Sequence, residues 1–114
     1  MIYHEQLTVS GVSGTVYSTR PAVGFLEYIK VLYTNGDAGG DVTITDDEEG
    51  TALLTLANNN TDKASPILVQ VMGTTGSAIA ATYSRIPLTS RIKMVVAQEA
   101  ANSTVVADVW WSDV

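Results

Sequence analysis

Residues 41–56, DVTITDDEEGTALLTL, hold two apolar runs on either side of four consecutive carboxylates. In the first run Val42 and Ile44 alternate with threonines, which is the period-2 pattern of a half-buried strand. Successive side chains of an extended segment point to opposite sides, so four carboxylates in a row do not converge on one ion. The stretch therefore predicts a β-hairpin with Asp46–Glu49 at a solvated tip, where Gly50 supplies permissive backbone.

Short β-type runs of the same kind recur along the chain and are separated by Gly, Asn, Asp and Ser. They are residues 28–34, 41–45, 51–56, 66–73, 91–98 and 103–111. The alanine-rich residues 77–84 are too short for a stable helix, and residues 97–103 form one helical turn or a wide hairpin loop. About seven to nine short strands predict an all-β fold, a single-domain antiparallel β-sandwich that is jelly-roll-like. Residues 1–23 are expected to be an N-terminal arm or first strands, and residues 24–114 the β-sandwich domain.

Composition narrows the range of partners. The length of 114 residues is typical of one domain. The net charge is −6 and the basic residues are scattered, and this charge distribution disfavours nucleic acid and anionic membrane surfaces as partners. No window holds the roughly 20 apolar residues of a membrane span, and the N-terminus lacks the pattern of a signal peptide. We therefore expect a chain made in a cytoplasm, with no membrane and no nucleic acid as partner.

Groupings that carry chemistry are weak in this sequence. His4 is the single histidine, so it is a weak candidate for the base of a hydrolytic triad and cannot build a multi-histidine metal site. There is no cysteine, which excludes thiolate metal sites. SGVSG at residues 10–14 does not match a nucleophile elbow, and GDAGG at residues 36–40 is not a phosphate loop. We predict no enzyme, no cofactor, no catalytic residue and no metal site. A calcium site involving Asp46–Glu49 stays open as a minor alternative.

The tail VWWSDV contains both tryptophans. In a strand over residues 103–111, Val105 and Trp111 lie on one face, whereas Val106, Asp108 and Trp110 lie on the other. At most one tryptophan then fills the core of a half-buried sheet. The other is expected under a loop or at an interface, where tryptophan is enriched.

From residue 24 onward the chain resembles a known group of proteins. The order is a strand, then TNGDAGGDVTITDDEEGTALLTL, SPILVQVMGTTG and IPLTSRIKMVVAQEAANSTVVADVWW, over roughly residues 24–111. This order of strands and turns is similar to small all-β virion proteins of tailed bacteriophages, of the head-decoration (cement) type. The resemblance implies a structural virion protein that binds the outer surface of a bacteriophage capsid and stabilises it.

The partner implied by this resemblance is the major capsid protein, and the expected assembly is a homo-oligomer, a trimer, on the capsid outer surface of the virion. The residues expected to contribute interface contacts are Ile2, Tyr3, Leu7, Val9, Trp110 and Trp111. The acidic tip at Asp46–Glu49 is expected to be dispensable for assembly. Two alternatives remain: a tail, neck or baseplate structural component, and a carbohydrate- or calcium-binding β-sandwich module.

Overall fold

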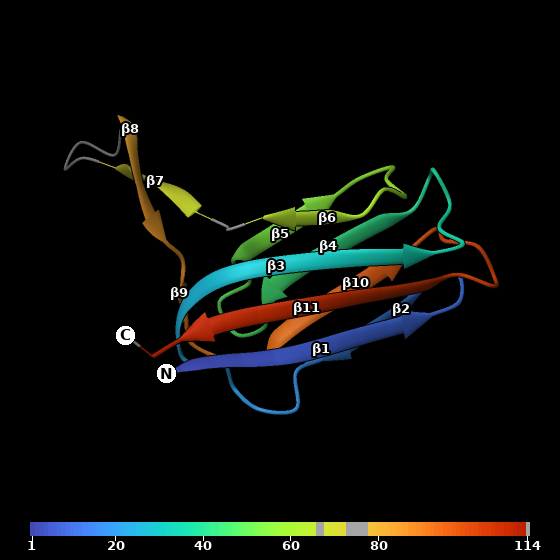
Figure 1. The fold of residues 1–114 in the computed structure, drawn as a ribbon, viewed down its shortest axis with the longest axis horizontal. Coiled ribbons are helices and arrows are strands. Elements are labelled where there is room, and N and C mark those ends of the chain that lie inside the picture. Colours follow the sequence, from blue (N-terminus) through green and yellow to red (C-terminus); the bar gives the residue numbers. More distant parts are fainter. Residues whose placement is uncertain (66–67, 73–77, 114) are drawn as a thin grey trace.

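The computed structural model describes residues 1–65, 68–72 and 78–113, and Figure 1 shows their course. The strands in this part of the chain are β1 (Ile2–Ser10), β2 (Gly14–Tyr17), β3 (Gly24–Thr34), β4 (Asp41–Asp46), β5 (Ala52–Leu56), β6 (Lys63–Ser65), β7 (Leu68–Met72), β8 (Ala78–Arg85), β9 (Pro87–Leu88), β10 (Ile92–Ala97) and β11 (Thr104–Ser112). They exceed the seven to nine expected, partly because the short β6 and β9 carry no readable alternation in the sequence.

Two antiparallel sheets pack face to face, which confirms the predicted β-sandwich. One sheet has the order β1-β11-β3-β6, with β9 also pairing with β3, and the other has the order β2-β10-β4-β5. Successive strands of the sandwich mostly alternate between the two sheets. Within the described part of the sandwich, only β4 and β5 are consecutive strands that pair directly, and this confirms the hairpin predicted from residues 41–56.

Alternating side chains of the two sheets fill one core. In β10 the buried residues are Ile92, Met94 and Val96, and in β11 every second residue from Val105 to Trp111 is buried. The alternation predicted for residues 103–111 is therefore confirmed, and β10 alternates in the same way. Full burial of an aliphatic side chain contributes about 1.5–3 kcal/mol relative to exposure, so this core is the main stabilising element of the fold.

The N-terminal residues belong to both sheets. β1 pairs in register with β11 along its whole length, and β2 pairs with β10. Both β1 and β2 are edge strands of their sheets. Leu7 and Val9 of β1 are buried in the common core. Among the described residues, no helix is long and apolar enough to cross a membrane.

The strands β7 and β8 form a third, two-stranded sheet. Residues 78–84 of the alanine-rich segment are extended backbone in β8, and residues 68–72 of the strand expected at residues 66–73 form β7. Residues 66–67 and 73–77, which include Pro66 and the turn expected at TTGS, lie outside the described residues. Figure 1 shows this hairpin standing beyond the sandwich, at the end where the N- and C-termini lie.

The root of the β7–β8 hairpin is joined to β3. The Leu26 backbone N–H donates to the Ile86 carbonyl oxygen at 2.9 Å. The Glu27 carboxylate accepts hydrogen bonds from the Arg85 guanidinium and, at 2.7 Å, from Ser112 Oγ. These two hydrogen bonds hold the pKa of Glu27 below its usual value, with Ser112 as the larger cause. The position where the hairpin leaves the sandwich is therefore fixed by polar contacts.

Candidate functional site

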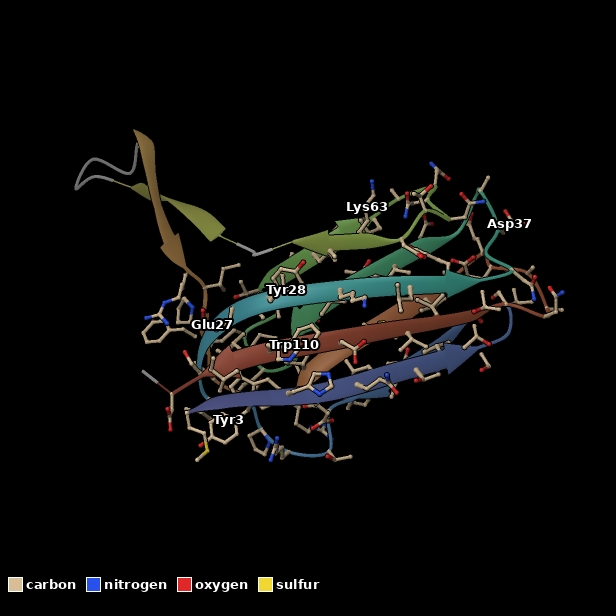
Figure 2. The ribbon with its side chains drawn as sticks, viewed as in Figure 1. Tyr3, Glu27, Tyr28, Asp37, Lys63 and Trp110 are labelled. Atoms are coloured by element: carbon tan, nitrogen blue, oxygen red, sulfur yellow. The ribbon has the colours of Figure 1, made fainter. Side chains whose placement is uncertain are left out.

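The outer face of β1, β11 and β3 carries a row of three aromatic rings, His4, Trp110 and Tyr28, which we call the aromatic row. Figure 2 labels Trp110 and Tyr28 of this row. Trp110 lies opposite His4 on β1 and opposite Tyr28 on β3. The imidazole stacks on the indole with ring centroids 4.6 Å apart, and the Tyr28 ring meets the indole edge-on at 5.6 Å. Because Trp111 fills the core, strand alternation turns Trp110 outward.

A row of polar residues lies next to the aromatic row. In it Asp108 is opposite Gln6 on β1 and Lys30 on β3. Asp108 Oδ1 lies 2.8 Å from His4 Nε2 and accepts a hydrogen bond from Gln6 Nε2 at 3.3 Å. These contacts restrict the rotamers of His4 and Gln6 before any partner arrives. These two side chains therefore lose less conformational entropy when a partner binds than freely rotating side chains would.

The six residues predicted at an interface fall into two groups. Leu7, Val9 and Trp111 are at most 6% exposed and pack in the core of their own chain. Ile2 is 68% exposed, and Tyr3 and Trp110 are partly exposed. Two members of the aromatic row, His4 and Tyr28, are not among the residues predicted at the interface, and the sequence suggested His4 only as a weak catalytic base. To place these two residues beside Trp110, one must know that the first and third strands pair with the last strand, and strand pairing is not visible in a single sequence.

A second candidate site is a pocket beside the chain termini, which we call the terminal pocket. Its volume is about 350 Å³, and it is lined by Tyr3, Arg20, Pro21, Val23, Trp111 and Asp113. The Tyr3 and Trp111 rings stack at 5.8 Å, and the Arg20 guanidinium carbon lies 5.3 Å and 5.5 Å from their centroids. The pocket is therefore an aromatic surface with a cation placed over it.

The charges of the terminal pocket have partners within the chain. Asp113 Oδ1 lies 3.0 Å from the N-terminal ammonium group of Met1, and its Oδ2 accepts a hydrogen bond from the Tyr3 hydroxyl at 3.2 Å. The hydrogen bond from the ammonium group is the main reason that the pKa of Asp113 lies below its ordinary value. The pocket thus presents apolar surface rather than an unpaired charge.

The acidic run at Asp46–Glu49 corrects one expectation. Glu48 and Glu49 are exposed at the tip, as predicted, and Gly50 has φ +70°. Asp46, however, is 1% exposed. Its carboxylate accepts hydrogen bonds from the Thr89 backbone N–H at 2.8 Å and from Ser90 Oγ. Asp46 therefore ties the β4–β5 turn to the loop before β10, and it is a buried structural residue rather than part of a solvated tip.

The pH dependence of stability should carry the signature of Asp46. Burial acts to raise the pKa of this carboxyl, but hydrogen bonds from Ser90, Thr89 and Glu49 outweigh burial and hold the pKa below its ordinary value of 3.8. A folded-state pKa below the unfolded value contributes stability that is present above the unfolded pKa and is lost as pH falls through the folded pKa. We expect urea unfolding to show decreasing stability below about pH 5. Asp46→Asn should flatten this decrease, whereas an unchanged slope would contradict the assignment.

Acidic residues elsewhere do not join the run at Asp46–Glu49. Asp41 and Asp46 lie at opposite ends of β4. Within the part of the chain that the structure describes, no group of three or more His, Cys, Asp or Glu residues is placed to hold a metal ion. The arrangement of the described carboxylates therefore does not support a calcium site at Asp46–Glu49.

Comparisons with known proteins do not assign a family. No protein-family model and no curated protein matches the chain. One similar solved structure is "Structure of infectious bursal disease virus Gx strain", with 13% sequence identity and a TM-score of 0.33. The match covers 96% of this chain, which spans about a third (33%) of that viral chain. A TM-score this low does not establish a common fold. The class defined by the structure itself is an antiparallel β-sandwich.

Proposed function

We propose that this chain is a structural virion protein that binds the outer surface of a bacteriophage capsid and stabilises it. The observation that carries the proposal is the aromatic row, because it places a partly exposed tryptophan between two other rings on an open sheet face. Trp and Tyr are the residue types most enriched among the residues that dominate binding energy at protein interfaces. The sequence resemblance to head-decoration proteins supports the choice of a capsid as the partner.

Such a role needs surface contact and no chemistry. A protein that binds the assembled shell and not its dissociated state stabilises the shell by mass action. Many copies in symmetric positions repeat the same contact around the particle. In this proposal the major capsid protein contacts the face of β1, β11 and β3, and Trp110 lies at the centre of that contact.

Co-sedimentation tests this function directly. Shells assembled from the major capsid protein, but lacking this chain, are mixed with the purified protein and pelleted. We expect Trp110→Ala to weaken binding by about 2 kcal/mol, roughly a 30-fold rise in Kd, because truncation of a central interface tryptophan has effects of this size. The variant should keep its melting temperature within a few degrees, because Trp110 lies outside the core.

Tyr17→Ala is the matched control. Tyr17 is an aromatic residue of β2 on the other sheet, is 37% exposed, and has the Arg91 guanidinium carbon 4.5 Å from its ring centroid. Its removal should leave the Kd unchanged. Wild-type protein that stays in the supernatant would rule out capsid binding, and equal losses in the two variants would rule out the aromatic row as the contact.

Glycan binding is a second candidate that the same face favours. Trp110 offers an aromatic surface, and Gln6 and Asp108 offer amide and carboxylate groups beside it. However, His4 already stacks on the indole, so a sugar ring has to displace it or use what remains of the indole surface. Calorimetric titration with neutral oligosaccharides separates the candidates. Heat that disappears in Trp110→Ala supports a glycan ligand, and no heat with any sugar removes it.

A further inference from the structure

The β7–β8 hairpin is not needed to complete the sandwich. Among the described residues its strands pair with each other and with no strand of either large sheet. Residues 64–84, which contain all of it except Arg85 at its root, carry no charged side chain and form the longest uncharged stretch of the chain. A two-stranded hairpin is marginally stable by itself in water, and unpaired strand edges can pair with other chains. We therefore expect the hairpin to pack against a surface outside its own domain.

A surface of matching character lies at the same end of the molecule. Val23 lines the terminal pocket and is 60% exposed, and Met1, whose ammonium group pairs with Asp113 of the pocket, is 77% exposed. Pro21 and the Tyr3 ring line the same pocket beside Val23. Exposed apolar surface that is gathered in one place marks an interaction site more often than scattered residues do.

The electrostatics of this surface favour an uncharged occupant. The two charged members of the terminal pocket already have partners within the chain, because Arg20 lies over two rings and Asp113 is paired with the N-terminal ammonium group. A charged peptide would have to displace those contacts, whereas an uncharged strand pair would not. Residues 64–84 have the required composition.

We propose that the β7–β8 hairpin of one copy seats on the terminal pocket of a second copy of this chain. Figure 1 shows the hairpin extending away from the termini of its own chain, so it is directed away from its own pocket. The contact is heterologous, since two different surfaces meet, and repetition of it produces a closed ring or a filament according to the rotation between copies. The polar contacts of Glu27 with Arg85 and Ser112 fix the angle at which the hairpin leaves the sandwich and hence the rotation between copies.

Disulfide trapping tests the contact, because the chain has no cysteine of its own. Gln70→Cys in β7 and Val23→Cys at the terminal pocket are purified separately, mixed and oxidised. The control partner is Val12→Cys, a valine with a comparable exposure of 52% in the loop at the far end of β1. We expect about a tenfold excess of the mixed Gln70–Val23 dimer over the Gln70–Val12 dimer, because docking raises the effective concentration of one thiol at the other.

The oligomeric state supplies an independent readout. Light scattering should give wild-type protein a mass above that of the monomer, and Val23→Asp should shift it to the monomer while Val12→Asp behaves like wild type. Circular dichroism and melting confirm that each variant is folded. Wild-type protein that is monomeric at every concentration, equal yields of the two mixed dimers, or a predominant Gln70–Gln70 dimer would each overturn the proposal.

This inference stands apart from capsid binding, because the aromatic row and the terminal pocket use different exposed residues. A monomeric Val23→Asp protein that still pellets with shells supports both the self-contact and the proposed function. An oligomer that never pellets with shells removes the proposed function and leaves the self-contact intact.

Discussion

Asp46→Ala is expected to lower the free energy of unfolding by about 3 kcal/mol, or the melting temperature by about 10 °C or more. The carboxylate is buried, and it accepts hydrogen bonds from Thr89 N, Thr89 Oγ1 and Ser90 Oγ. Hydrogen bonds to a charged group contribute about 1.5–3 kcal/mol, and a buried donor left without its acceptor costs about 1–3 kcal/mol. The measurement is urea or thermal unfolding at neutral pH.

The neighbouring Asp47 provides the matched control. Asp47 Oδ2 lies 3.3 Å from an Arg91 nitrogen, and the Arg91 side chain is 50% exposed. Surface ion pairs of this kind contribute about 0–1 kcal/mol, so Asp47→Ala should have a small effect. If the two alanine variants lose equal stability, the contacts of Asp46 do not anchor the turn. Replacement of Asp47, Glu48 and Glu49 together, with Asp46 kept, should leave the fold intact.

The difference between Asp46 and its neighbours shows which features of the hairpin the sequence predicts and which it does not. Alternation placed Val42 and Ile44 inside and put the hairpin at the right residues, because side-chain period is a local property of a strand. The same alternation places Asp46 on the inner side with Ile44. The composition of the run nevertheless favoured an exposed position for Asp46, because four consecutive acidic residues are typical of a solvated turn. The loop that donates hydrogen bonds to Asp46, at Thr89 and Ser90, is more than forty residues away in the chain. No local sequence pattern therefore predicts this contact.

The composition of the aromatic row could not be predicted from the sequence for the same reason. Alternation in β11 separated Trp110 from Trp111 correctly, because both lie in one strand. The neighbours of Trp110 come from β1 and β3, and their register depends on which strands pair and on the bulge between Trp110 and Trp111. These are tertiary properties. A hydrophobic pattern can therefore assign an inner and an outer face to each strand, but the members of a surface cluster follow only from sheet order.

Gly24→Ala should destabilise the chain by about 4 kcal/mol, since both backbone strain and overpacking contribute. Gly24 begins β3 with φ +133°, a conformation that L side chains rarely adopt. A Cβ at this position would overlap the Ser112 carbonyl oxygen and lie 3.0 Å from Asp113 Cα. Both of these neighbours are backbone atoms, one in the last residue of β11 and one in the residue after it, so they cannot move aside as a side chain would.

Gly11→Ala separates strain from overlap. Gly11 also has a positive φ, +98°, but a Cβ there meets no atom within 4 Å. It should therefore cost only the conformational part, about 1–2 kcal/mol. Unfolding in urea measures both variants. An equal loss in the two would show that β11 yields at Ser112 and that strain alone acts at Gly24. A larger loss for Gly24→Ala shows that the close approach of β11 to the start of β3 is rigid.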